Sequence, residues 1–273
     1  MLELEHGFRI VDVHVELEPD QTRRPRGIGD PEQIKREMQQ AGIVRSLAFA
    51  GQRNESYLRA NNAVARMAVD RPIDAVARIT GLRDPGGSPG ARLRNVARRR
   101  SEKHTSPDDI EQYGYEDRFI GFMIDPAADG LPEEDVLERL EAVGLPVITY
   151  GGREFPPSTI EETLLAYEFP LVISHFGGYP LEKPLMEATV DMLGRHEACF
   201  VDTSFVRLRD PLERAVMEHP DRVLFGSGAP ASHPSVAVME ILTLDVPEDA
   251  MRKVFSKNAT RLLEEMNHTV GHE

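Results

Sequence analysis

Three ionisable residues alternate along one apolar stretch, VDVHVEL, near the start of the chain. They are Asp12, His14 and Glu16. Alternate side chains of a strand point to the same face, so we expect all three to share one face. Imidazole and carboxylate groups are common protein ligands of Zn²⁺ and Mn²⁺. The stretch predicts either a divalent metal site that uses His14 and Glu16, or a buried His14 that is hydrogen-bonded to a neighbouring carboxylate.

Two later stretches, TYGGRE and SHFGGYP, carry polar side chains where apolar runs end. Tyr150 and Arg153 lie in the first stretch and His175 lies in the second. Tyrosine donates hydrogen bonds, arginine binds carboxylates through two parallel hydrogen bonds, and histidine exchanges protons near neutral pH. Each of the three also has a structural interpretation: Tyr150 in packing, Arg153 at the surface, and His175 as a support for other site residues.

Five further residues follow apolar runs and are weaker candidates. Asp125 could accept a proton in catalysis, because a carboxylate near a substrate is a common general base. His233 is expected to cap a helix, although it could also reach a site. The other three, which are more often structural, are Arg78, Asp202 and Ser204.

Apolar runs of strand length alternate with amphipathic runs of helix length throughout the chain. A charged, irregular insertion over 83–117 follows the third strand, two helices over 234–243 and 247–266 close the chain, and 266–273 form a tail. The eight expected strands cover residues 8–17, 44–50, 73–80, 119–126, 145–152, 171–178, 199–206 and 222–228.

Eight strand–helix units in 273 residues predict a single α/β domain, a (β/α)8 TIM barrel over 1–273. A doubly wound open sheet is the alternative, but no GxGxxG or P-loop motif follows any strand, which argues against nucleotide binding. In a barrel of this kind, the functional site lies at the carboxyl ends of the strands. The candidate residues above stand at those ends, so the elements would bring them together.

Composition excludes several classes of function. The formal net charge of −14 disfavours binding to a nucleic acid backbone. No run reaches the ~18 apolar residues of a membrane helix, and no secretory signal is visible, so we expect a cytoplasmic protein. A lone cysteine, Cys199, excludes an internal disulfide. The arginine-rich segment 92–103 is either a solvated helix face or a site wall that attracts anions.

Seven blocks of the sequence resemble the amidohydrolase-2 family, the amidohydrolase-related barrels that include aminocarboxymuconate-semialdehyde decarboxylase and related decarboxylases and hydrolases. They are, in order, RIVDVHVEL, AGIVRS, LPVITYGG, FPLVISHFGGYP, CFVDTSFV, DRVLFGSGAP and KVFSKNATRLL. The resemblance spans nearly the whole chain. It implies a TIM barrel, a divalent metal (Zn or Mn), a small substrate with a carbonyl or carboxylate group and, as a family expectation, a homodimer.

The metal site of that family does not carry over completely. His14 matches the first histidine of a His-x-His pair, but Glu16 stands at the second. Tyr150 stands where strand five supplies a histidine, and His175 matches the histidine of strand six. Gly228 stands where strand eight supplies an aspartate. In such barrels that aspartate binds the metal and takes a proton from the attacking water, and glycine can do neither.

Three hypotheses follow from this pattern. The first is a hydrolase or decarboxylase with a remodelled site, in which His14, Glu16 and His175 hold a metal while Tyr150 and Arg153 orient the substrate. The second is a barrel that binds a small molecule without turnover, because two metal ligands have been lost. The third is metal-free catalysis with His175 as the general acid or base.

Overall fold

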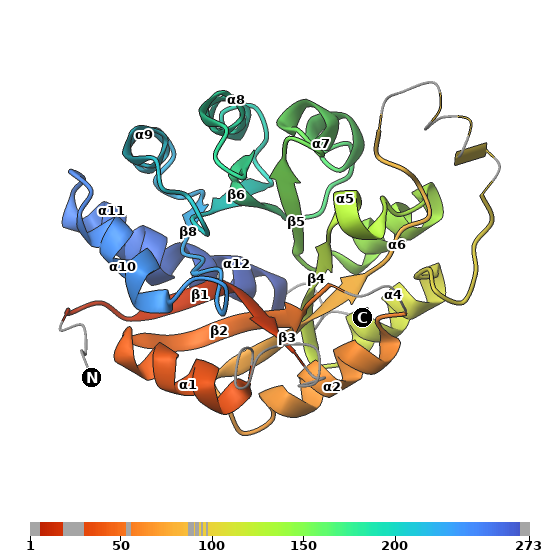
Figure 1. Ribbon diagram of the computed structural model, residues 1–273, viewed down its shortest axis with the longest axis horizontal. Coiled ribbons are helices and arrows are strands. Elements are labelled where there is room, and N and C mark those ends of the chain that lie inside the picture. Colours follow the sequence, from red (N-terminus) through yellow and green to blue (C-terminus); the bar gives the residue numbers. More distant parts are fainter. Residues whose placement is uncertain are drawn as a thin grey trace.

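Eight parallel strands form the centre of the molecule, as Figure 1 shows in a computed structural model that describes residues 6–18, 30–52, 56–86, 90, 93, 95, 96 and 98–267. Side chains are described as far as residue 264. Each strand pairs with the next in sequence order. The strands are β1 (Ile10–Leu17), β2 (Ile43–Ala50), β3 (Ile73–Ile79), β4 (Phe119–Ile124), β5 (Val147–Gly152), β6 (Leu171–Tyr179), β7 (Cys199–Asp202) and β8 (Val223–Leu224).

The barrel closes between β1 and the segment that follows β8. The Val13 N–H donates to the Phe225 carbonyl at 2.9 Å, and the Gly228 N–H donates to the His14 carbonyl at 3.1 Å. The predicted strand over 222–228 is therefore regular only at Val223–Leu224, since its remainder bonds irregularly to β1. This closure confirms the predicted (β/α)8 barrel.

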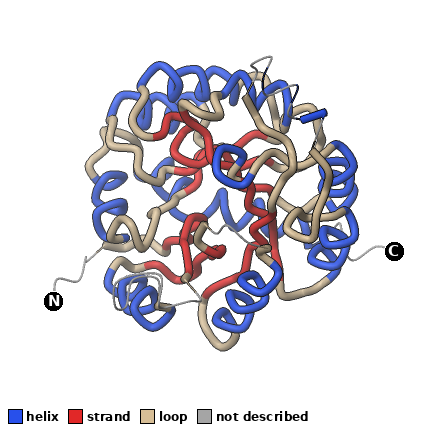
Figure 2. The backbone as a smooth tube through the Cα atoms, turned by 45° about the vertical axis from the view of Figure 1, so that its right-hand side comes forward, coloured by secondary structure: helices blue, strands red, loops and turns tan. Residues whose placement is uncertain are grey.

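Helices surround the strands on the outside of the barrel, as the tube view makes plain (Figure 2). They are α1 (Pro31–Gln40), α2 (Leu58–Ala68), α4 (Pro107–Tyr115), α5 (Pro126–Asp129), α6 (Glu134–Val143), α7 (Pro157–Thr163), α8 (Lys183–Leu193), α9 (Arg209–Glu218), α10 (Pro234–Leu242), α11 (Glu248–Arg252), the π-helix η1 (Lys253–Lys257) and α12 (Asn258–Asn267). The helix predicted over 247–266 is thus three consecutive segments. The predicted tail begins within α12, and residues 268–273 lie outside the described residues.

Two hydrophobic layers hold the fold together. The larger layer fills the space between the strands and the outer helices. The smaller layer lies inside the barrel, where side chains from all eight strands meet Ala259, Leu262 and Leu263 of α12. Burying apolar surface contributes ~25 cal/mol per Å², so both layers stabilise the barrel. Because apolar side chains fill the α12 end, the polar site is restricted to the opposite end.

Side-chain capping interactions define the first residues of several helices. Asp30 caps α1 by accepting a hydrogen bond from the Glu32 N–H. Inside the predicted insertion, Ser106 and Asp109 form a reciprocal capping box at the start of α4. Such a box satisfies amide groups that have no partner within the helix. Helix α4 packs on α6, so the end of the insertion belongs to the outer layer.

The arginine-rich segment 92–103 is described in part, and Arg92 and Arg94 lie outside the described residues. Arg100 pairs with Glu133 and Asp135 near the start of α6, with N–O distances of 2.7 and 2.6 Å. Arg98 donates to the Leu82 carbonyl at 3.0 Å. These bonds tie the segment to the adjacent surface. Among the described helices, none is long and apolar enough to cross a membrane.

Candidate active site

A cavity of about 780 Å³ opens at the carboxyl ends of the strands. Five of the candidates predicted from the sequence line it: Glu16, Asp125, Tyr150, Arg153 and His175. His14 lies beneath the cavity with 1% of its surface exposed. The structure therefore brings side chains from β1, β5 and β6, and from the end of β4, to one place.

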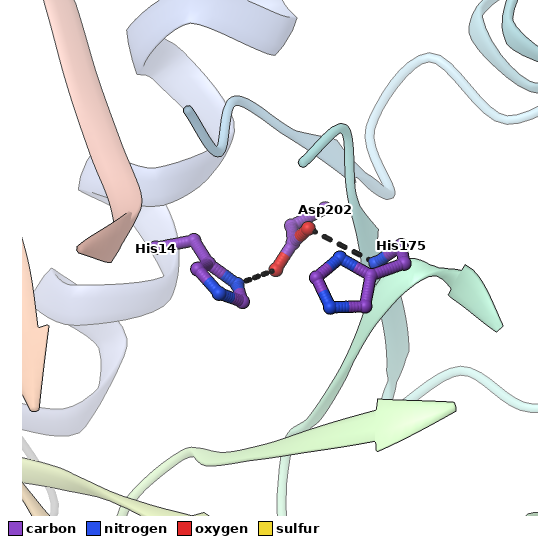
Figure 3. A group of neighbouring side chains, drawn as sticks. All are labelled: His14, His175 and Asp202. Atoms are coloured by element: carbon purple, nitrogen blue, oxygen red, sulfur yellow. Dashed lines mark hydrogen bonds and ion pairs between the residues drawn. The ribbon is translucent and has the colours of Figure 1, made fainter. Parts of the chain in front are cut away.

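His14 is held from below by the carboxylate of Asp202, which ends β7. Its Nδ1 lies 3.0 Å from Asp202 Oδ2 and 3.1 Å from Ser174 Oγ. Figure 3 marks the bond between His14 and Asp202 with a dashed line. The edge of the His14 ring contacts Phe49, with ring centroids 5.2 Å apart. A buried imidazole that is hydrogen-bonded to a carboxylate is one of the two interpretations that the sequence left open for His14.

Asp202 accepts hydrogen bonds from five donors, although the sequence marks it only as a weak candidate. Oδ2 accepts from His14 Nδ1–H and, at 2.7 Å, from the Ser174 hydroxyl. Oδ1 accepts from the backbone N–H groups of His175 and Ser204, at 3.2 and 2.9 Å, and from the Ser204 hydroxyl. Because β1, β6 and the segment after β7 all contribute donors, this fully buried carboxylate fixes the relative positions of three strand ends.

The charges of His14 and Asp202 stabilise one another. Burial opposes the charged form of His14, but the carboxylates of Asp202, Glu16 and Asp12 raise its pKa above the ordinary value. Burial likewise opposes the charged form of Asp202, yet the charge and hydrogen bond of His14 lower its pKa far below the ordinary value. The two groups therefore form an ion pair, which a buried location favours only when hydrogen bonds are also satisfied.

Tyr150 connects His14 to the cavity. Its hydroxyl donates to Glu16 Oε1 at 3.0 Å, and its oxygen lies 3.4 Å from His14 Nε2. The Tyr150 ring stacks on His14 and on His175, with centroid distances of 5.4 and 5.0 Å. Burial and the nearby Glu16 carboxylate raise the pKa of Tyr150 well above its ordinary value, so the phenol keeps its proton.

His175 presents one ring nitrogen for chemistry. Nδ1 lies 2.8 Å from Ser204 Oγ and 3.1 Å from the Ser204 carbonyl oxygen. Because the Ser204 hydroxyl donates its proton to Asp202, both Ser204 oxygens act as acceptors for His175. Nδ1 therefore carries the proton, and Nε2 carries a lone pair in a residue that lines the cavity.

The surroundings of His175 keep its imidazole neutral. Burial, followed by the positive charge of His14, lowers the pKa of His175 to about 4. The backbone of His175 has φ 59°, in the left-handed region that non-glycine residues seldom adopt. Strained backbone of this kind occurs where the surrounding structure over-determines a functional side chain.

A second charged cluster stands beside the cavity. Arg78, with 1% of its surface exposed, contacts Asp125 at 3.2 Å and Asp129 at 2.7 Å. Tyr57 also donates to Asp129. Burial raises the pKa of Asp125 to about 6, against the opposing effect of the Arg78 charge. Asp125 also caps α5 through the Ala128 N–H, so this candidate is tied into the scaffold.

Three residues predicted as candidates make other contacts in the structure. The side chain of Arg153 is 73% exposed and pairs with Glu182 at the rim of the cavity. His233 caps α10 by accepting from the Ser235 N–H at 3.2 Å. Asp12 Oδ1 accepts hydrogen bonds from the Ser227 N–H at 2.9 Å and from the His14 N–H at 3.1 Å, so its carboxylate joins β1 to the segment after β8.

Phe205 fills the space beside Gly228, the position where the resemblance predicts an aspartate. A Cβ atom on Gly228 would lie 2.6 Å from the Phe205 ring, and Gly228 has φ +70°. Phe205 itself has φ 56° and stacks edgewise on His175 at 5.2 Å. Both the backbone conformation and the neighbouring ring therefore favour glycine at this position.

The potential ligand atoms of His14, His175 and Asp202 lie within 4.8 Å of one another, a spacing that would suit a divalent cation. Their hydrogen bonds, however, do not fit a bound ion. Both Asp202 oxygens are engaged by donors, and His14 Nδ1 and His175 Nδ1 are bonded to Asp202 and Ser204. Coordination would require Asp202 to give up some of these bonds.

The fold and the position of the site define a class of protein, a (β/α)8 barrel with polar groups at the carboxyl ends of its strands. The sequence model of the amidohydrolase family (Amidohydro_2) matches residues 11–264, so the chain belongs to this family. The predicted resemblance is thereby confirmed. No curated protein sequence matches the chain significantly.

Solved structures with the same fold include both uncharacterised proteins and decarboxylases. An uncharacterised TIM-barrel protein of Bordetella bronchiseptica is 21% identical, with a TM-score of 0.68 over 95% of this chain and 100% of its own. A 2,6-dihydroxybenzoate decarboxylase from Rhizobium is 15% identical, with a TM-score of 0.63 over 94% and 99% of the two chains.

A third similar structure, dihydroxybenzoic acid decarboxylase from Polaromonas, contains bound manganese and the inhibitor 2-nitroresorcinol. It is 14% identical, with a TM-score of 0.64 over 97% of this chain and 100% of its own. At these identities the likeness establishes the fold.

Proposed function

We propose that the protein is an amidohydrolase-family enzyme that hydrolyses or decarboxylates a small substrate bearing a carbonyl or carboxylate group. One observation carries the proposal: His175 is a neutral, buried imidazole whose Nδ1–H is fixed by Ser204 and whose other nitrogen is left for a molecule in the mouth cavity. A base that is oriented through its second nitrogen is a common feature of general acid–base catalysis.

His175 and Tyr150 have complementary roles in this proposal. In a hydrolysis, His175 Nε2 accepts a proton from the attacking water while the Tyr150 hydroxyl turns from Glu16 and donates to the substrate oxygen on which charge develops. In a decarboxylation of a hydroxybenzoate, His175 accepts the hydroxyl proton and returns a proton to the ring carbon that releases carbon dioxide. The stacked contact between the His175 and Tyr150 rings holds the two side chains next to each other in either reaction.

Turnover of a defined substrate panel tests the proposal. The panel contains hydroxylated benzoates, chosen because similar structures are decarboxylases of such acids, together with lactones and carboxylic esters. For an accepted substrate, His175→Gln should lower kcat by roughly 10²–10⁴-fold, the usual contribution of a general base. Tyr150→Phe should lower it less, and Tyr167→Phe, a tyrosine outside the cavity, serves as the matched control. Unchanged turnover in His175→Gln would reject the assigned role.

Binding without turnover is the second candidate function. The Phe205 ring beside Gly228 favours it, because the position expected to carry a catalytic aspartate holds no side chain. A small molecule that raises the melting temperature and is recovered unchanged, with no difference between wild type and His175→Gln, would support this alternative.

A further inference from the structure

The two ring nitrogens of His14 both face hydrogen-bond acceptors. Nδ1 faces Asp202 Oδ2 at 3.0 Å, and Nε2 faces the Tyr150 oxygen at 3.4 Å. Tyr150 has only one hydroxyl proton, and that proton is donated to Glu16. A ring nitrogen that faces an acceptor carries a proton. His14 is therefore an imidazolium with no lone pair for a metal ion.

The Asp202 carboxylate is also committed to neighbours, which leaves His175 Nε2 and the Glu16 carboxylate as the remaining donors, fewer than the three protein ligands of a usual zinc site. Asp202 accepts from donors on β1, β6 and the segment after β7, so moving either oxygen toward an ion would break bonds in three parts of the wall. A buried donor that loses its acceptor costs about 1–3 kcal/mol. The rearrangement would therefore oppose binding.

Position 228 supplies no metal ligand either, because the Phe205 ring occupies the space beside Gly228. Its ring lies within contact distance of a side chain that any residue other than glycine would place at position 228. Zinc sites normally use three or four protein ligands. An apolar ring supplies none, and it replaces a polar ligand with a surface that disfavours a charged ion.

We infer that the site holds no divalent metal ion and that the His14 imidazolium, paired with Asp202, supplies the fixed positive charge beneath the cavity. A similar solved structure contains manganese. We attribute the absence of a metal here to Glu16, Tyr150 and Gly228, which stand where the family resemblance implies two histidines and an aspartate. The inference concerns the resting protein and does not depend on turnover, so it stands or falls separately from the proposed function.

Metal content provides the first test. The full-length protein, purified without chelators and without added metal, should contain far less than one Mn or Zn per chain by elemental analysis. His14→Ala should contain the same residual amount as wild type. A content near one ion per chain that disappears in His14→Ala would overturn the inference.

The response of the melting temperature to metal provides the second test, and it requires only the wild-type protein. An ion that binds the folded state raises the melting temperature as its concentration increases. Addition of Mn²⁺ or Zn²⁺ should leave the melting temperature unchanged, as Mg²⁺ does in a parallel sample. A saturable rise with Mn²⁺ or Zn²⁺ alone would contradict the inference.

Discussion

Two buried charged clusters meet at the mouth of the barrel, and they differ in what their charges can do. Around Asp202 the cationic partner is a histidine, His14, whose protonation depends on its surroundings. Around Asp125 and Asp129 the cation is Arg78, a guanidinium that stays charged throughout the physiological range. The first cluster therefore contains a titratable cation, whereas the cation of the second cluster stays charged and holds the ends of β2 and β4 in place.

The two clusters also differ in their contacts: residues next to the first line the cavity, whereas Arg78 of the second bonds to the ends of strands. His175 and Tyr150 contact the first cluster and also line the cavity. Arg78 instead bonds the Ala50 carbonyl, Asp125 and Asp129, and so links the ends of β2 and β4. Both clusters are buried, so burial alone does not distinguish them. They differ in the type of cation, which is a histidine in the first cluster and an arginine in the second.

Removal of Arg78 should have the largest effect on stability. Arg78→Met leaves Asp125 and Asp129 without their buried counter-charge, and breaking such a pair costs roughly 3–5 kcal/mol. Urea denaturation should show a decrease of this size in the free energy of unfolding. Arg118→Met is the matched control, because Arg118 forms an exposed pair with Glu116 and should change stability by no more than about 0.5 kcal/mol. Equal effects of the two substitutions would contradict a supporting role for Arg78.

Acid should destabilise the protein through His175. The pKa of His175 falls from an unfolded value of 6.5 to about 4 in the folded chain. Between these values the unfolded state binds more protons, so stability is full above pH 6.5 and declines as the pH falls toward 4. At about 1.4 kcal/mol per pKa unit, the loss approaches roughly 3 kcal/mol.

His175→Gln removes this titration and isolates its contribution. Urea denaturation of wild type and variant between pH 7 and pH 4 should show their difference in unfolding free energy shifting in favour of the variant as the pH falls. A constant difference over that range would show that His175 is not held neutral by the fold.

A side chain at Gly228 should have a smaller effect. Gly228→Ala places a Cβ against the Phe205 ring and a non-glycine residue at φ +70°, so we expect a loss of roughly 1–3 kcal/mol. Gly7→Ala is the control, since a Cβ there meets no atom within 4 Å. Combining Gly228→Ala with Phe205→Ala should recover part of the loss. If it recovers none, the ring is not the cause.

The strand pattern was sufficient to predict the barrel and the end at which polar residues gather. Apolar runs of strand length fixed the number of units, and strand polarity placed Glu16, Tyr150 and His175 around one cavity. These predictions depend on periodicity and on chain direction, both of which are local properties of the sequence.

The partners across the barrel could not be predicted in the same way. Asp202 collects five hydrogen bonds because the carboxyl ends of β1, β6 and β7 converge at one end of the barrel, a relation that the sequence near Asp202 does not contain. Phe205 meets Gly228 because the chain turns sharply after β7, with a left-handed backbone at a phenylalanine. Arg153 turned toward Glu182 because a carboxylate from the segment after β6 lies within reach.

The protonation states of His14 and His175 provide the most direct test of the account. In ¹⁵N-labelled protein at pH 7, imidazole NMR should show His14 with protons on both ring nitrogens, and His175 with a proton on Nδ1 and none on Nε2. A His14 with one unprotonated nitrogen, or a His175 with its proton on Nε2, would contradict it.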